Sequence, residues 1–147
     1  MKRLLIALTL VAVFAAASFA AVKDFGKFTV DVPDNWTASQ DGPTAVIVKN
    51  DNTASLTITL APTEGAGLGD IAKAFTDSFK GNGLFKSVSE PEKDEDGDYT
   101  FSMVNNQDVE SKALLTGDDS NYCLFVMTGI EAAADEISAM LDSVKDK

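Results

Sequence analysis

Hydrophobic and polar residues alternate one by one along the first half of the chain, beginning with residues 28–32 (FTVDV). An alternation of period two predicts a strand with one buried face. Pro33 and the Asp-Asn pair after it end this strand, because proline donates no ladder hydrogen bond and Asx residues favour corners. Trp36 then opens a short second strand. We expect its ring to be buried as the anchor of the corner, with an exposed ligand-binding ring as the alternative.

The same alternation predicts two more strands, at residues 44–48 and 55–60, and turn residues separate them. After Pro62 the period changes from two to that of a helix. The apolar spacing i, i+3, i+4, i+7, i+11 predicts a helix that ends at Gly81 and Gly83. Its apolar positions are Leu68, Ile71, Ala72, Phe75 and Phe79.

Strand patterns then resume at residues 85–90, 99–104, 109–115 and 122–128, with acidic or polar turns between them. The last of these segments is apolar on both faces. That composition is typical of a central strand covered on both sides.

The C-terminal segment has the spacing of a second amphipathic helix. Thr128 and Glu131 have the spacing of a capping box, which predicts the helix start. An apolar stripe is expected to face the core, and four charged residues are expected to face water: Asp135, Glu136, Asp142 and Lys145. The elements together predict an α+β fold, with a single antiparallel, meander-type sheet of about six to eight strands flanked by two helices.

Residues 1–20 have the features of a secretory signal peptide. Lys2 and Arg3 precede an apolar run, and Ser18 and Ala20 suit the small positions of a cleavage site. Residues 21–147 would then form a single α+β domain. We therefore expect a soluble bacterial protein of the periplasm or the medium, without stable membrane insertion after cleavage. An uncut membrane anchor is the alternative, because the apolar run reaches the lower length limit for spanning.

The charge of the chain is strongly acidic. Its formal net charge is −11, and all 23 acidic residues lie after residue 20. Such a charge disfavours nucleic acid and anionic membrane surfaces as partners.

The catalytic inventory of the chain is small. It has no histidine and one cysteine, Cys123, so Ser-His and Cys-His nucleophiles, His-ligated zinc and thiolate metal cages are excluded. Ser111 and Lys112 are adjacent but would point to opposite faces of a strand. The carboxylates fall in turns or on polar helix faces, where little would raise a pKa for acid/base catalysis. We expect no enzyme activity and no cofactor.

Oxygen ligands are concentrated in one acidic segment around Gly97. Glu92, Asp94, Asp96 and Asp98 are candidate metal ligands there. A calcium loop that starts at Glu92 would need a glutamate at position twelve, which is Met103, so the loop motif fails. We prefer a charged hairpin turn that discourages edge pairing.

The exported F-x-V-x-V-P-x-x-W segment and the order of elements resemble the PsbP/Mog-like fold family, which includes DcrB-related small exported bacterial proteins. The resemblance covers residues 25–144, and the matching residues are Phe28, Val30, Val32, Pro33, Trp36 and Gly42. It implies an antiparallel sheet flanked by helices and a role in binding or assembling proteins. Pro33 and Trp36 are therefore structural markers that carry no chemistry.

We expect a non-enzymatic exported binding or assembly module whose partner is another exported or membrane-associated protein. The first alternative is a carrier that lodges a small apolar ligand between sheet and helix. Its pocket would be lined by Phe75, Phe79, Phe85, Phe101, Phe125 and Met127. Weak binding of a divalent cation is a further alternative.

Overall fold

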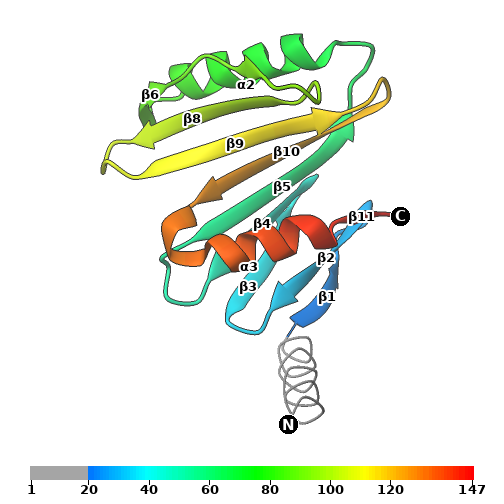
Figure 1. The fold of residues 1–147 in the computed structure, drawn as a ribbon, viewed down its shortest axis with the longest axis vertical. Helices are drawn as coiled ribbons and strands as arrows, with labels where there is room; N and C mark the ends of the chain where they lie inside the picture. The colour runs from blue at the N-terminus through cyan, green and yellow to red at the C-terminus, as the bar shows by residue number, and fades with distance from the viewer. Residues whose placement is uncertain (1–19) are drawn as a thin grey trace, which may run out of the picture.

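A computed structural model of the protein describes residues 20–147, so the expected signal peptide at 1–20 lies outside the described residues except for the backbone of Ala20. An eight-stranded antiparallel sheet dominates the fold, in the order β3-β4-β5-β10-β9-β8-β6 with β7 also paired to β8 (Figure 1). Its strands are β3 (Trp36–Asp41), β4 (Thr44–Lys49), β5 (Ser55–Pro62), β6 (Phe85–Val88), β7 (Glu92–Lys93), β8 (Tyr99–Asn105), β9 (Glu110–Gly117) and β10 (Asn121–Thr128).

A second, three-stranded sheet joins the two ends of the described chain. It consists of β1 (Ala20–Asp24), β2 (Phe28–Pro33) and β11 (Lys145–Asp146), in the order β1-β2-β11. The sequence prediction of one single sheet is therefore wrong for the first strand. The strand before the corner at Pro33, β2, takes its ladder partners from β1 and β11 instead of β3, and its buried apolar side chains close one end of the core.

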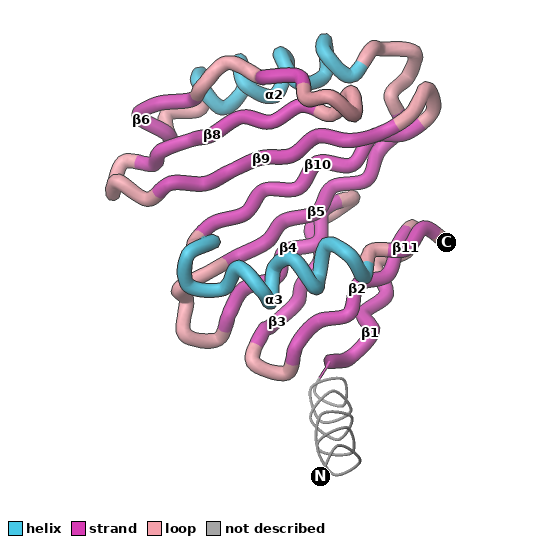
Figure 2. Tube along the Cα trace, in the orientation of Figure 1, coloured by secondary structure: helices cyan, strands magenta, loops and turns pink. Residues whose placement is uncertain are grey.

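Two helices, α2 (Leu68–Gly81) and α3 (Ile130–Ser143), lie at different ends of the large sheet (Figure 2). They also pack on opposite faces, because the buried residues form two clusters that divide each central strand by alternation. On β10, Leu124 belongs to the cluster under α2 and Phe125 to the cluster under α3. The predictions of an α+β fold with two helices and of a central β10 covered on both faces are confirmed.

The helices cover the sheet diagonally. We call the two sides the α3 face and the α2 face. On the α3 face, α3 and β2 share a cluster with β3, β4 and β5; on the α2 face, α2 contacts β6, β8 and β9. Among the described elements, this leaves one half of each face without a helix. The uncovered half of the α3 face lies over β8 and β9, and that of the α2 face lies over β3, β4 and β5.

The Trp36 corner is an anchor, as the sequence predicts. Its side chain is only 5% exposed, and its indole N–H donates to Glu136 Oε2 of α3 at 2.5 Å. Lys49 Nζ lies 3.2 Å from the other carboxylate oxygen. Glu136, which was predicted to face water, keeps 31% of its side chain exposed, but its carboxylate also ties α3 to the start of β3 and the end of β4. These contacts fix the helix on its face of the sheet.

The predicted capping box at the start of α3 is also wrong. Thr128 ends β10 and its hydroxyl bonds that of Ser111 at 2.6 Å, while the N-cap is Gly129 with a φ of 71°. A Cβ at residue 129 would lie 2.0 Å from the backbone oxygen of Thr53. Glycine is needed there because the chain passes the turn between β4 and β5 too closely for a side chain.

Candidate binding groove

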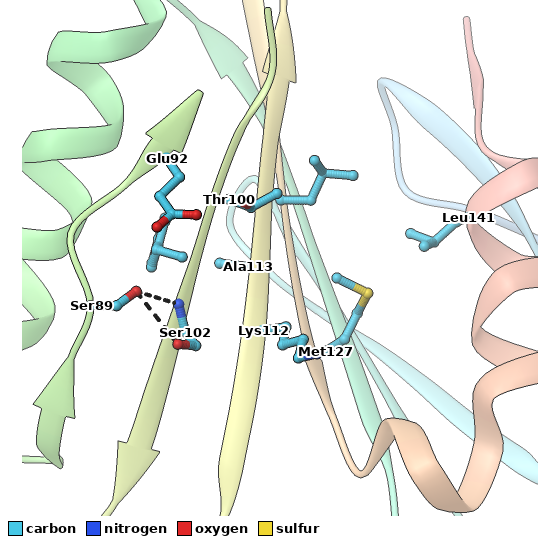
Figure 3. Close-up of a pocket in the computed structure, with 10 residues that line it drawn as sticks. Ser89, Glu92, Thr100, Ser102, Lys112, Ala113, Met127 and Leu141 are labelled. Carbon is cyan, nitrogen blue, oxygen red and sulfur yellow. Dashed lines mark hydrogen bonds between the residues drawn. The ribbon is translucent and has the colours of Figure 1, made fainter. Parts of the chain in front are cut away.

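A groove of about 580 Å³ occupies the uncovered half of the α3 face. Its floor is formed by side chains of β8, β9 and β10, and its two sides come from α3 and from the β6–β7 segment. Figure 3 shows Leu141 of α3 opposite Met127, with Glu92 on the far side of the floor. The floor residues that point to this face are Thr100, Ser102, Lys112, Leu114 and Met127.

A second depression of about 310 Å³ lies beside the start of α3 and shares Lys112 with the groove. Val109 and Ile130 give it apolar surface, and Glu110 and Glu131 give it charge. Because Lys112 lines both depressions, they are neighbours on the same side of α3, and together we call them the α3 groove.

Two exposed hydrophobic side chains, Leu84 and Val109, lie in or next to the β6 and β8–β9 end of the large sheet. Among the described residues, three large apolar side chains are strongly exposed: Val22, Leu84 and Val109. Val109 lines the α3 groove, and Leu84 lies in a turn that is tied to the β8–β9 turn by the bond from Asn106 Nδ2 to Gly83 O at 3.0 Å. Such side chains are normal when single, but adjacent to an apolar groove they extend a contact surface.

Strand alternation explains how β9 supplies the centre of the groove. Ser111 is buried toward the α2 face, whereas Lys112 is exposed on the α3 face. The hydroxyl of Ser111 is bonded to Thr128. The prediction that Ser111 and Lys112 cannot share a proton is confirmed, because the two side chains leave the strand on opposite sides.

The charges of the α3 groove are unpaired within the described residues. The five ion pairs of the described residues involve five other lysines, and neither Lys112 nor the carboxylates of the groove take part in them. These carboxylates are Glu92, Glu110 and Glu131. Three acidic groups and one amine therefore surround an apolar floor.

The acidic turn predicted as a candidate cation site folds as a tight hairpin connection. The Asp94 carboxylate accepts the backbone N–H groups of Asp96 at 2.9 Å and Asp98 at 3.0 Å. Gly97 has a φ of 89°, as such a turn requires. Within residues 20–147, no three cation-ligating side chains come together. Of the four candidate ligands, Glu92 lies apart from this turn and lines the α3 groove.

Cys123 lies beneath the covered part of the α3 face. Burial raises the pKa of its thiol to about 12, and the nearby Asp146 carboxylate adds to the effect. A thiol with so high a pKa is almost wholly protonated at neutral pH and is a poor nucleophile. Cys123 therefore acts as a small hydrophobic residue of the cluster under α3.

The six residues expected to line a carrier pocket do not surround one cavity. Phe75, Phe79, Phe85 and Phe101 pack with one another under α2, with ring centroids 5.6 to 6.2 Å apart. Phe125 and Met127 lie on the α3 face. Only Phe101 and Met127 of the six also line the α3 groove.

The α3 groove was not found by sequence reasoning. Lys112 and Leu114 occupy the positions of β9 that point away from the α2 face, and nothing in the local sequence shows that Leu141, 27 positions after Leu114, faces them. The one available signal was the strand face of β9 that mixes an apolar residue with charged ones.

In the described part of the chain, neither helix is long and apolar enough to cross a membrane.

Comparison with solved structures shows a PsbP-like fold. The chain is similar to the solution structure of cyanobacterial PsbP (CyanoP) from Synechocystis sp. PCC 6803, with a TM-score of 0.51 and 9% identity over 87% of this chain and 92% of that one. It is also similar to LpqN of Mycobacterium tuberculosis, a protein involved in cell envelope biogenesis, with a TM-score of 0.44 and 15% identity over 86% and 89% of the two chains. No protein-family model and no curated protein sequence matches the chain. The PsbP-like expectation is confirmed at the level of fold, and the relation to DcrB stays a prediction.

Proposed function

We propose that the protein is a non-enzymatic exported module that binds another exported or membrane-associated protein through the α3 groove. The observation that carries this proposal is the pair of neighbouring depressions beside α3, which have apolar side chains at their base and charges at their rim that form no ion pair in the described chain. The chemical inventory supports it, because the chain has no histidine and its single thiol has a pKa of about 12.

Site-specific photo-crosslinking in the cell tests the location of the partner. A photoreactive amino acid at Lys112 would lie in the groove, and the same residue at Thr57 would lie on the uncovered half of the α2 face. We expect one defined protein adduct from position 112 and none from position 57. Equal adducts from both positions, or none from 112, would refute the proposal.

A carrier of a small apolar ligand is the second candidate, favoured by the apolar floor at Leu114 and Met127. It would use the open α3 groove instead of an internal pocket. Native mass spectrometry separates the two candidates. A stoichiometric lipid adduct on the purified protein would favour the carrier, and an adduct-free mass would favour protein binding.

Export is part of the proposal and rests on the sequence of residues 1–20. Amino-terminal sequencing of the protein from the periplasmic fraction should begin at Ala21. An intact start at Met1 in the membrane fraction would instead support the uncut anchor.

A further inference from the structure

We infer that the α3 groove recognises an apolar peptide segment flanked by basic residues, contributed by the partner protein. This inference rests on the proposed function and adds to it the chemistry of the bound segment. Apolar side chains form the floor, carboxylates stand at both ends, and a lysine lies between them.

The apolar part of the segment is defined by the floor and sides of the groove. Leu114 and Met127 come from adjacent strands, Leu141 faces them from α3, and Ile130 and Val109 continue the surface past the start of the helix. The volume of about 580 Å³ lies in the range of roughly 300–1,000 Å³ that is usual for ligand-binding clefts. Burial of apolar side chains here supplies the affinity.

Polar groups on the same floor favour a peptide over an acyl chain. The side chains of Thr100 and Ser102 line the groove, and the Ser89 hydroxyl lies beside them, accepting the Ser102 backbone N–H at 2.9 Å. A peptide carries a donor and an acceptor at every residue and needs such partners when it is buried. In contact with an acyl chain, these hydroxyls would lose the hydrogen bonds that they make to water and would gain none in return.

The charges at the rim of the groove determine the sign of charge that is favoured at the two ends of the bound peptide. Glu110 and Glu131 stand beside the start of α3, and Glu92 stands at the side formed by β7. Lys112 is the single cation between them, so the rim has three negative charges and one positive. The whole chain, with a net charge of −11, adds a field of the same sign. A segment with a Lys or Arg at each end matches this rim.

The same charges disfavour the other occupants. A second copy of the chain would bring its own net negative charge toward an acidic rim. An anionic lipid would have Lys112 as its only cationic contact in the groove and three carboxylates against it. Both therefore meet repulsion where a basic segment meets attraction.

The test compares three synthetic peptides that share the core Leu-Val-Leu-Val and differ in their flanks, which are two lysines, two glutamates or two serines. Binding to the purified protein is measured by isothermal titration calorimetry. We expect the lysine-flanked peptide to bind most tightly and to weaken as salt is raised, because exposed charge pairs are screened. Tighter binding of the glutamate-flanked peptide, or equal binding of all three, would overturn the inference.

Charge variants of the protein test the same point from the other side. Glu110→Gln and Glu131→Gln should each weaken the lysine-flanked peptide about two- to fivefold, which is usual for an exposed charge pair. Lys112→Glu should strengthen it by a similar factor. Glu64→Gln, an exposed residue near α2 and outside the groove, is the matched control and should change nothing. Weaker binding after Lys112→Glu would identify an anionic ligand instead.

The outcomes separate this inference from the proposed function. If position 112 crosslinks a protein but the lysine-flanked peptide has no preference, the partner is a protein of different chemistry and only the inference fails. If dodecanoate binds and the lysine-flanked peptide does not, the groove holds a lipid and both fail. If the protein elutes as a dimer whose dissociation frees the groove, the occupant is a second copy, and both fail.

Discussion

Each face of the large sheet has one half without a helix, and the side chains on these two uncovered halves differ in their chemistry. The half over β3, β4 and β5 on the α2 face, which we call the threonine face, is uncharged along β4 and β5 and consists of Thr44, Val46, Val48, Ser55, Thr57 and Thr59. Two of its hydroxyls satisfy each other, since Thr44 and Thr59 are 2.7 Å apart. The half over β8 and β9 instead contains the α3 groove, with unpaired charges and a helix beside it.

The difference shows which features make an uncovered sheet face a binding surface. Antiparallel sheets commonly leave one face to solvent, and short polar and β-branched residues do this without a partner. The threonine face follows that rule. The groove departs from it, because Leu114 and Met127 are apolar side chains on the part of this face that has no helix over it, and α3 stands beside them without closing the space.

The largest expected effect concerns Cys123, which packs against the buried cluster under α3. Because its pKa is about 12, the thiolate at pH 8 is roughly a thousandfold scarcer than for an ordinary cysteine. The native protein should react with a disulfide reagent about a thousandfold more slowly than the unfolded chain. Rapid labelling of the native protein would mean that the open surface extends beneath α3.

Removal of the Trp36 anchor should have the next largest effect. Trp36→Ala leaves a cavity and removes one of the two partners of the Glu136 carboxylate, so we expect a loss of about 3–5 kcal/mol in the free energy of unfolding. Trp36→Phe, the matched control, keeps most of the burial and should cost about 1–2 kcal/mol. Urea titrations measure both. An unchanged free energy of unfolding in Trp36→Phe would show that the bond to Glu136 contributes nothing, and equal losses from the two variants would show that burial of the ring contributes nothing.

The Glu136 carboxylate should make the free energy of unfolding depend on pH. The hydrogen bond from Trp36, followed by that from Lys49, holds the pKa of Glu136 below its ordinary value of 4.5. Its contribution is complete above that pH and is lost as the pH falls through the lowered folded-state pKa. Glu136→Gln should cost about 1 kcal/mol at pH 7 and less near pH 3. A cost that grows on acidification would contradict the assignment.

The smallest expected effect lies on the threonine face. Thr44→Val with Thr59→Val removes both members of a hydrogen bond and replaces them with groups of the same shape, which is nearly neutral. We expect stability within about 0.5 kcal/mol and unchanged binding of the lysine-flanked peptide. A loss of peptide binding in this double variant would remove the distinction between the two faces.

The sequence predicts most of the large sheet and both helices because their periodicity is local. The strands near 44–48, 55–60, 99–104 and 122–128 lie where alternation places them, and α2 follows its apolar spacing. The short strands β1, β7 and β11 were missed. Strands of two or five residues carry too little pattern, and the partner of β11 in β2 lies more than 100 residues earlier in the chain.

The groove and the tether of Glu136 could not be predicted, because both depend on which face each helix covers. The 3.6-residue period places Glu136 on the polar side of α3, and only the position of Trp36, 100 residues earlier, makes it a hydrogen-bond partner. Likewise the start of α3 is decided at Gly129 by its approach to Thr53, which overrides the capping-box spacing of Thr128 and Glu131. Tertiary contacts determine the partner of Glu136 and the start of α3, and these contacts cannot be inferred from the local sequence.

An NMR titration tests the central claim most directly, namely that the α3 groove and not the threonine face is the binding surface. The lysine-flanked peptide is added to ¹⁵N-labelled protein, and the amide shifts of both faces are followed. The account predicts saturable shifts at Ser102, Lys112, Leu114, Glu131 and Leu141, with little change in β4 and β5. Shifts centred on Val46, Thr57 and Thr59, with the groove unaffected, would contradict it.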